Sequence, residues 1–399
     1  MGKHCKKNQL KKFRDSSLDQ PLRAGALYVH VPLCLSKCRY CDFYSLPAKP
    51  GQGDFVVSSL LDELAMRRDS LAQELRSIFV GGGTPTALGA KPLEKLLGAL
   101  AQLASPGLTE FTVEANPATV DNTIAAVASG AGVNRVSLGA QSFDAGQLKL
   151  LGRRHQPGQI GQAFEMLRRA GIENISLDLI YGIPGQSASS WLNSLAQALS
   201  LGPSHVSCYS LSFEPGTELF DDRQAGRVAE VDDETQREMY YRAIDHLAQA
   251  RFEHYEISNF AKPARQCEQN LTYWRNREYL GIGPAACSYL AGERRTNLPN
   301  LHRYIEHIER GTAPPHHTER IVGRAAMAET LMLGLRLVEG VDIASFAERF
   351  GQGPQETFPQ SFLRYISLGA VERIATHLRI GREFLFTADT ILADILAEA

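Results

Sequence analysis

Three cysteines lie close together near the start of the sequence, at Cys34, Cys38 and Cys41. Their spacing, C-x3-C-x2-C, places three thiols within one short and polar segment. Four-iron clusters normally take four cysteine thiolates. Three thiolates with no fourth nearby leave one iron open to a small ligand, like the open position of a catalytic metal site. We therefore predict a 4Fe–4S cluster with one available iron.

Two other uses of these thiols stay open at this point. A structural zinc site needs a fourth ligand at short spacing, and the nearest histidine, His30, falls within a predicted strand. Redox-active thiols are the second alternative. A disulfide framework is not expected, because the seven cysteines are an odd number in a long chain. The basic N-terminus is also followed by no apolar segment that would make it a secretory signal.

Short apolar segments alternate with helical segments from residue 27 to about residue 215. Repeated strand–helix units predict a parallel sheet with right-handed crossovers, and six units suit an incomplete (β/α)6 barrel of the α/β class. The predicted strands are Leu27–Val31, Ile78–Val80, Glu110–Glu114, Asn134–Leu138, Ile175–Leu179 and His205–Leu211. The predicted helices are Phe55–Ala72, Leu93–Leu103, Ile160–Ala170 and Trp191–Leu201. Because active sites of such folds follow the C-terminal ends of the strands, we expect every motif to gather there.

The second half of the chain departs from this alternation. A helix is predicted over Asp233–Ala250 and a strand over Glu253–Ile257, and the pair Pro314–Pro315 marks a linker. From residue 324 onward, three helical patterns and a hairpin-like pair, Leu378–Ile380 with Glu383–Phe386, predict a small winged-helix-like α+β domain. That region holds more acidic than basic residues, so we expect a structural or docking role and no DNA binding.

Glycine and acidic residues follow several of the predicted strands. Gly82 and Gly83 come after the second strand, where glycine lets the backbone approach a ligand closely. No Gly-Lys-Ser/Thr follows them, so the segment is not a P-loop. Glu114 ends the third strand, where a carboxylate can bind ribose hydroxyls. Asp178 lies in an apolar strand, and a lone acid there is costly without a polar partner or a cation.

These motifs resemble the radical S-adenosylmethionine (SAM) superfamily. The segments YVHVPLC and CRYCDF resemble the oxygen-independent coproporphyrinogen oxidase-like group within it, and the resemblance covers nearly the whole chain from Leu27. It implies a 4Fe–4S cluster and SAM as cofactors, with Arg153 pairing the methionine carboxylate. The positions that match the SAM contacts of the superfamily are Tyr28, Tyr40, Gly82, Gly83, Thr84, Glu114, Gln141, Arg153, Asp178 and Ser212.

Two classes within this group compete. The oxidases decarboxylate coproporphyrinogen III to protoporphyrinogen IX, whereas the heme chaperones keep the cluster and SAM site but carry heme to haemoproteins. The oxidases resemble C-x3-C-x2-C-x-C, and the position of their fourth cysteine is Phe43 here, as in the chaperones. The oxidases also have a longer arm than the 27 residues that precede Tyr28. We expect a heme chaperone, with the oxidase as the first alternative and a radical SAM methyltransferase that modifies heme as the second.

The segment from Cys267 to Trp274 resembles a motif, H-N-x-x-Y-W, that the chaperones associate with heme. Asn270, Tyr273 and Trp274 match it, but Gln269 replaces the histidine. Glutamine is a poor axial ligand for heme iron. The axial ligand therefore stays open, with Tyr273, Cys267 and His254 as candidates and core packing as the alternative role for the aromatic residues.

The resemblance and the composition together set the expected organisation and partners. The expected partners are heme, haemoprotein acceptors and a cellular electron donor, and a homodimer is left open. The formal charge of -2 and the absence of a long apolar run indicate neither nucleic acid nor a membrane span, so a cytoplasmic protein is expected. The predicted domains are a basic tail (1–26), a radical SAM barrel (27–230), a barrel extension with the heme motif (231–313) and a C-terminal accessory domain (314–399).

Overall fold

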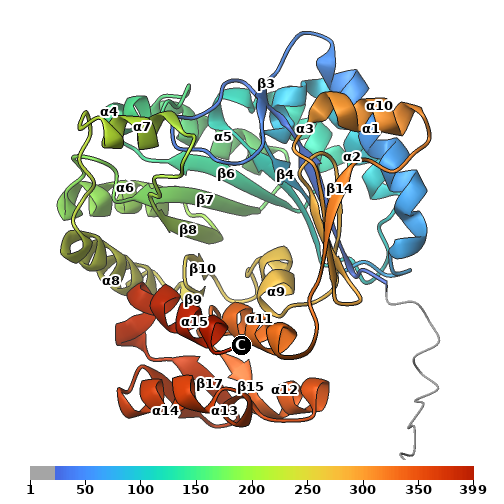
Figure 1. Cartoon of the computed structure of the whole chain (residues 1–399). Helices are drawn as coiled ribbons and strands as arrows, with labels where there is room; N and C mark the ends of the chain where they lie inside the picture. The colour runs from blue at the N-terminus through green and yellow to red at the C-terminus, as the bar shows by residue number, and fades with distance from the viewer. Residues whose placement is uncertain (1–22) are drawn as a thin grey trace, which may run out of the picture.

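The computed structural model describes residues 23–399, and its main feature is a curved nine-stranded sheet (Figure 1). The strand order is β11-β1-β4-β5-β6-β7-β8-β10-β9. Six strands, β1 and β4 to β8, run parallel and carry the predicted strand–helix alternation. Their bounds are Ala26–Val31, Ser77–Gly82, Glu110–Ala115, Arg135–Gln141, Asn174–Tyr181 and His205–Ser210. The prediction of an incomplete six-strand barrel is confirmed.

Three further strands extend this sheet at its two edges. At one edge β11 (Leu280–Ile282) adds in parallel to β1. At the other edge β10 (Asn259–Ala261) adds antiparallel to β8, and β9 (Glu253–Glu256) pairs antiparallel with β10. The edge strands β9 and β11 are not paired with each other among the described residues, so the barrel stays open.

Helices cover the outer face of the sheet because each has one apolar stripe. In α2, Leu93, Leu96, Leu97 and Leu100 are fully buried at helical spacing. Side-chain caps fix several helix starts; for example, Asp232 accepts from the backbone N–H of Thr235 at the start of α8. The barrel helices are α1 (Gln52–Arg67), α2 (Ala90–Ala101), α3 (Asn122–Gly130), α4 (Ala145–Leu150), α5 (Pro157–Arg169), α6 (Ala188–Ser200), α7 (Glu218–Gln224) and α8 (Asp233–Gln249).

Apart from β11, the chain from residue 268 onward forms three smaller units. Helix α9 (Glu268–Trp274) enters the barrel, and a three-stranded sheet then joins β12 (Cys287–Leu290), β13 (Glu293–Asn297) and β14 (His316–Arg320), with α10 (Leu301–Glu309) between the last two strands. Strands on both sides of Pro314–Pro315 therefore share one sheet. The C-terminal helices, drawn from orange to red in Figure 1, are α11 (Gly323–Gly334), α12 (Ile343–Phe350), α13 (Pro354–Thr357), α14 (Pro359–Ser367) and α15 (Ala388–Ala397).

The predicted hairpin around Gly381 is wrong. The strands that pair are β16 (Val371–Ile374) and β17 (His377–Ile380), with β15 (Val341–Asp342) on the other side of β17. Ala375 makes the turn with a φ of 51°. Residues other than glycine rarely adopt a positive φ, so an alanine at this position does not predict a turn. The segment Arg382–Thr387 is a 3₁₀ helix that leads directly into α15. The C-terminal region also holds five helices and not three.

The predicted tail lies almost entirely outside the described residues, which begin at residue 23. Its last residue, Ala26, already belongs to β1, and Ala24 bridges to Leu71. Among the described residues, no helix has both the length and the apolar composition needed to cross a bilayer.

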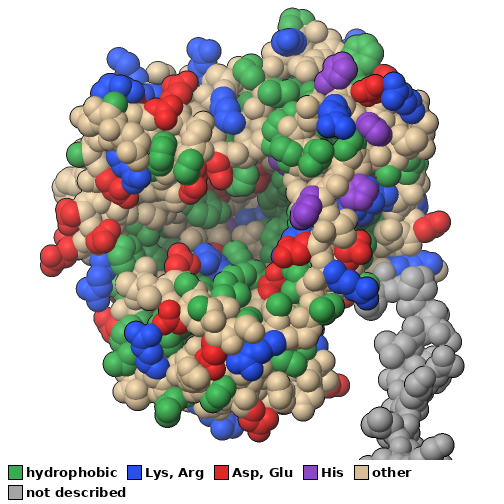
Figure 2. Space-filling model, in the orientation of Figure 1, with side chains coloured by type: hydrophobic (Ala, Val, Ile, Leu, Met, Phe, Trp, Pro, Cys, Tyr) green, Lys and Arg blue, Asp and Glu red, His purple; other side chains and the backbone are tan. Residues whose placement is uncertain are grey.

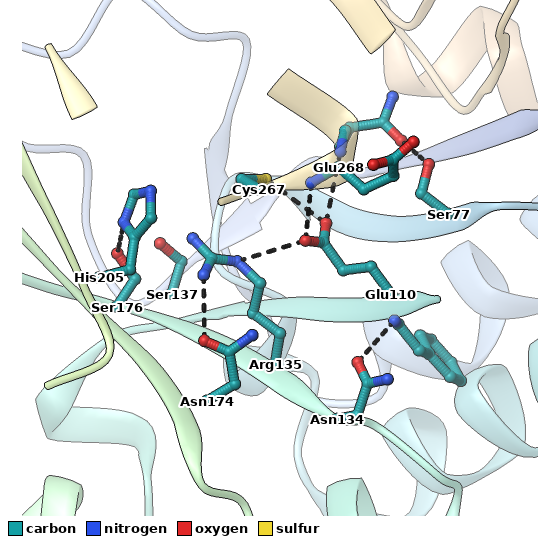
Figure 3. Close-up of polar contacts among 12 residues, drawn as sticks. Ser77, Glu110, Asn134, Arg135, Ser137, Asn174, Ser176, His205, Cys267 and Glu268 are labelled. Carbon is teal, nitrogen blue, oxygen red and sulfur yellow. Dashed lines mark hydrogen bonds and ion pairs between the residues drawn. The ribbon is translucent and has the colours of Figure 1, made fainter. Parts of the chain in front are cut away.

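Buried polar groups hold α9 against the N-terminal ends of the strands (Figure 3). Glu110, the first residue of β5, accepts from the backbone N–H of Glu268 at 2.9 Å and from Cys267 Sγ at 3.4 Å. Its other partner is Arg135, whose Nε lies 3.8 Å from Glu110 Oε2 while Nη1 donates to Asn174 at 3.4 Å. Arg135 is 2% exposed, so water cannot screen its charge. Glu110 is the carboxylate that pairs with it. The carboxylate therefore both caps a helix and balances a buried guanidinium.

We expect Glu110→Ala to destabilise the fold by about 3–5 kcal/mol, because it leaves a buried guanidinium uncompensated and removes the acceptor for α9. Urea unfolding followed by circular dichroism measures the change. The matched control is Glu165→Ala, which removes an exposed carboxylate from α5 and should shift the free energy of unfolding by less than about 0.5 kcal/mol. Equal effects of the two substitutions would contradict this role of Glu110.

Candidate functional site

The three cysteines lie on one loop that leaves β1. The short strands β2 (Leu33–Cys34) and β3 (Leu46–Pro47) pair in parallel and close the loop, which we call the cluster loop (residues 34–47). A hydrogen bond between His30 Nε2 and the carbonyl of Tyr44 at 2.8 Å joins the loop to β1. The structure thus holds the three thiols on one closed loop at the C-terminal edge of the sheet.

Arg39 fixes the outer side of the cluster loop. Its guanidinium pairs with Glu218 and Asp222 of α7 and donates to the carbonyl of Leu150 at 3.1 Å. The backbone of Arg39 also bonds to α7, because its carbonyl accepts from the N–H of Leu219 at 2.8 Å. These contacts tie the cluster loop to helix α7, which lies far from it in the sequence.

Cys34, Cys38 and Cys41 are free thiols and line a single pocket of about 460 Å³. Burial is the largest cause of the raised pKa of the Cys34 thiol, and it raises the pKa of Cys41 to about 11. Among the described residues, no three His, Cys, Asp or Glu side chains converge on a single metal ion. That geometry disfavours zinc, whose four ligands must surround one ion, and suits a cluster that binds each thiolate at a different iron.

The glycine segment after β4 packs directly against the start of the cluster loop. The N–H groups of Gly83 and Thr84 donate to the carbonyls of Val31 and Leu33 at 2.8 and 2.7 Å. A Cβ on Gly83 would lie 2.6 Å from the carbonyl oxygen of Leu33, and Thr84 Oγ1 donates to Cys34 Sγ at 3.4 Å. Position 83 thus requires glycine, because the two backbone segments approach too closely for a side chain. The N–H groups of Gly83 and Thr84 are already hydrogen-bonded within the protein.

Two acids stand on the wall of the same pocket. Glu114 Oε2 accepts from the N–H of Gly82 at 3.0 Å, and burial followed by the charge of Asp178 raises the pKa of Glu114 to about 7. Asp178 accepts from the hydroxyls of Ser137, Ser176 and Ser207, so three serines supply the polar partners that the sequence required. Burial is still the largest influence on Asp178 and raises its pKa.

Arg153 is the cation of the pocket wall. Its Nη1 donates to Cys38 Sγ at 3.4 Å and its Nη2 donates to the carbonyl of Gly139 at 2.7 Å. Its Nε is buried and has no partner among the described residues. Gln141, nearby at a bulge that ends β6, has a φ of 65°, a strained conformation of the kind that clusters at functional sites.

Most of the predicted SAM contacts line this pocket. Tyr40, Gly82, Gly83, Thr84, Glu114, Gln141, Arg153, Asp178 and Ser212 do so. Tyr28 does not; its hydroxyl bonds to His30 Nδ1 at 3.0 Å inside the barrel. Asn116, Ser137, Tyr209 and Glu214 also line the pocket and are not among the predicted contacts. Ser137 and Tyr209 lie within β6 and β8, whereas Asn116 and Glu214 follow strand ends and could have been found from that position.

The model of the radical SAM superfamily matches residues 28–198, and the model of the HemN C-terminal domain matches residues 323–383. The heme chaperone HemW of Bacillus subtilis is 37% identical over 83% of this chain and 88% of its own length. The HemW of a Synechocystis strain is 39% identical over 80% of each chain.

The chain belongs to the HemW family of radical SAM proteins. Its fold is also that of the coproporphyrinogen III oxidase HemN from Escherichia coli, which matches with a TM-score of 0.81 over 95% of this chain and 92% of that chain. The two sequences are 19% identical, so this match bears on the fold alone. The radical SAM domain implies a 4Fe–4S cluster and SAM, and the pocket suits both through its three thiols and the unpartnered Nε of Arg153.

The motif that resembles the heme segment of the HemW family lies at the opposite end of the barrel. Gln269 is 1% exposed, and its Oε1 accepts from Ser77, the first residue of β4, at 2.7 Å. Tyr273 packs edge-on against Tyr279 within the barrel. The expectation that every motif follows the C-terminal strand ends is therefore wrong for this one, because Ser77 and Glu110 fix α9 at the N-terminal ends.

The raised pKa of Glu114 has a measurable consequence in the ligand-free protein. The folded state keeps this carboxyl protonated up to about pH 7, whereas the unfolded chain ionises it near 4.5. Stability therefore falls as the pH rises through this window. We expect Glu114→Gln to unfold at nearly the wild-type temperature at pH 5 and to be more stable than wild type at pH 8, by on the order of 2 kcal/mol. Thermal unfolding at both pH values measures this, and a constant difference would contradict it.

Proposed function

We propose that this protein is a heme chaperone that carries a 4Fe–4S cluster and SAM in the pocket of the cluster loop. The observation that supports this most strongly is the similarity to HemW proteins over most of both chains, together with Phe43. Phe43 stands where the oxidases place a further cysteine, and its side chain is 66% exposed at the pocket.

We assign the cluster to Cys34, Cys38 and Cys41, and SAM to the pocket wall around Arg153. The amino group of SAM donates hydrogen bonds, so it would be bound by backbone carbonyl oxygens of the glycine segment; the N–H groups of Gly83 and Thr84 are already bonded to Val31 and Leu33. The carboxylate of SAM would accept from N–H groups of Arg153 that Cys38 and Gly139 leave free, and the acids Glu114 and Asp178 would bind hydroxyl or amino groups. Held by the three cysteines, a reduced cluster would supply the one-electron chemistry that cleaves the sulfonium of SAM, and the pocket wall would hold SAM in position for it.

The charge of the pocket favours the chaperone over the oxidase. Coproporphyrinogen carries several carboxylates, which an active site would bind through free cations. The pocket wall instead contains one cation, Arg153, which already contacts Cys38 and Gly139, and the four acids Asp42, Glu114, Asp178 and Glu214. A polyanionic porphyrinogen would meet repulsion there.

For the heme itself, we propose Trp274 as the contact from the α9 motif. It lines a second cavity of about 360 Å³, between α9 and the C-terminal helices, whose wall also holds Arg277, Arg349 and His377. The ring of Trp274 stacks on the guanidinium of Arg336 at 4.9 Å. Heme contacts from Asn270 and Tyr273 stay a prediction, whereas the burial of Gln269 argues against a contact from that side chain. Haemoprotein acceptors, a cellular electron donor, a homodimer and a cytoplasmic location also stay predictions.

The deciding experiment compares two activities of the full chain after anaerobic cluster reconstitution. We expect a Soret band on titration with heme and no formation of protoporphyrinogen from coproporphyrinogen in the presence of SAM and reductant. An authentic coproporphyrinogen oxidase assayed in parallel controls for the reagents. Turnover to protoporphyrinogen would overturn the proposal in favour of the oxidase.

Two substitutions on α9 test where the heme binds. We expect Trp274→Ala to weaken heme binding about tenfold, because a stacked aromatic surface is lost. We expect Gln269→His to leave the affinity unchanged, because position 269 is sealed inside the barrel. Soret titrations measure both. A large rise in affinity for Gln269→His would instead show that the buried position reaches heme iron.

A further inference from the structure

A basic groove lies beside the cluster loop. It has a volume of about 550 Å³ and runs between the cluster loop, the end of α4 and the turn that leads into α5. Lys37, Lys149 and Arg154 line it and are exposed, and its wall contains no Asp or Glu. Lys and Arg side chains are visible along the upper left of the molecule in Figure 2, where Figure 1 places α4.

The three cations of the basic groove are not neutralised by the protein itself. None of them forms an ion pair with any carboxylate within residues 23–399. The adjacent Arg39 is different, because Glu218 and Asp222 pair with it. The groove therefore keeps a positive potential on a chain whose formal net charge is -2.

The basic groove lies directly beside the cysteines that we assign to the cluster. Arg153 lines both the groove and the cluster-loop pocket, and its Nη1 contacts Cys38 Sγ at 3.4 Å. Arg154 Nε donates to the hydroxyl of Ser36 at 3.2 Å, between Cys34 and Cys38 in the sequence. A molecule in this groove is thus separated from a cluster thiolate by a single side chain.

We propose that the basic groove docks the electron donor of the cluster, a small acidic protein with a one-electron flavin or iron–sulfur centre. This rests on the proposed function, which needs the cluster to be reduced. In the encounter the donor centre loses one electron and the cluster gains one, and no bond or proton is exchanged. Opposite charge on the donor would speed association and orient its redox centre toward Cys38.

The features of the groove favour a protein over nucleic acid. Its wall contains no Phe, Tyr or Trp on which bases could stack. Leu35, on the same cluster loop, is 46% exposed. An apolar residue beside exposed charges is typical of protein interfaces, which combine an apolar centre with a polar rim.

The test measures binding of two donors, an acidic flavodoxin and an acidic two-iron ferredoxin, to the reconstituted full chain. We expect Lys149→Glu to weaken binding of the preferred donor about tenfold at low salt and to flatten the dependence of the association rate on salt. The control is Arg169→Glu, which reverses an exposed, unpaired charge in the last turn of α5, about 18 Å along that helix from the groove. The control should bind like wild type.

Further readouts separate docking from the other properties of the protein. Reduction of the cluster by dithionite and the Soret titration with heme should be the same for Lys149→Glu and wild type. The proposal is wrong if wild type binds neither donor, if both substitutions weaken binding equally, or if single-stranded RNA binds more tightly than both donors. A wild-type protein that binds a donor but no heme would overturn the proposed function and leave the docking surface intact.

Discussion

The parallel register of β1 and β4 to β8 is the constraint on which the whole molecule depends. Parallel strands end at the same edge of a sheet, so residues that follow different strands come together there. The cluster loop, the glycine segment, Glu114 and Gln141 meet for this reason, although more than 100 residues separate the first from the last. The same register gathers Ser77, at the start of β4, with Glu110 at the opposite edge.

The C-terminal and N-terminal edges of the parallel strands differ in what covers them. At the C-terminal edge the walls are thiols, acids and one arginine, and a pocket of about 460 Å³ stays open. At the N-terminal edge α9 fills the barrel, with its first N–H groups on Glu110. A helix start brings a partial positive charge and unsatisfied donors, so a buried carboxylate there satisfies both α9 and Arg135.

The α9 segment that resembles the heme motif therefore lies at the other end of the barrel from the cluster-loop pocket. The cluster-loop pocket and Trp274 lie at opposite ends of the barrel, and Trp274 faces the C-terminal helices across a separate cavity. Arg336 stacks on Trp274 from the C-terminal side. A cargo bound there would lie at the junction between the barrel and its C-terminal domain, whereas the cluster loop remains free to receive electrons at its own surface.

The sequence by itself determined the three-cysteine loop and the six parallel strands, because each rests on local spacing and alternation. Most of the predicted SAM contacts also line the pocket, because residues at the C-terminal ends of parallel strands come together at one edge of the sheet. Only the tertiary structure decided the position of α9, which depends on contacts with Glu110 and Ser77 more than 150 residues away. The pairing of β16 with β17 could not be predicted from the sequence either, because the turn depends on a positive φ at Ala375 that alanine rarely adopts.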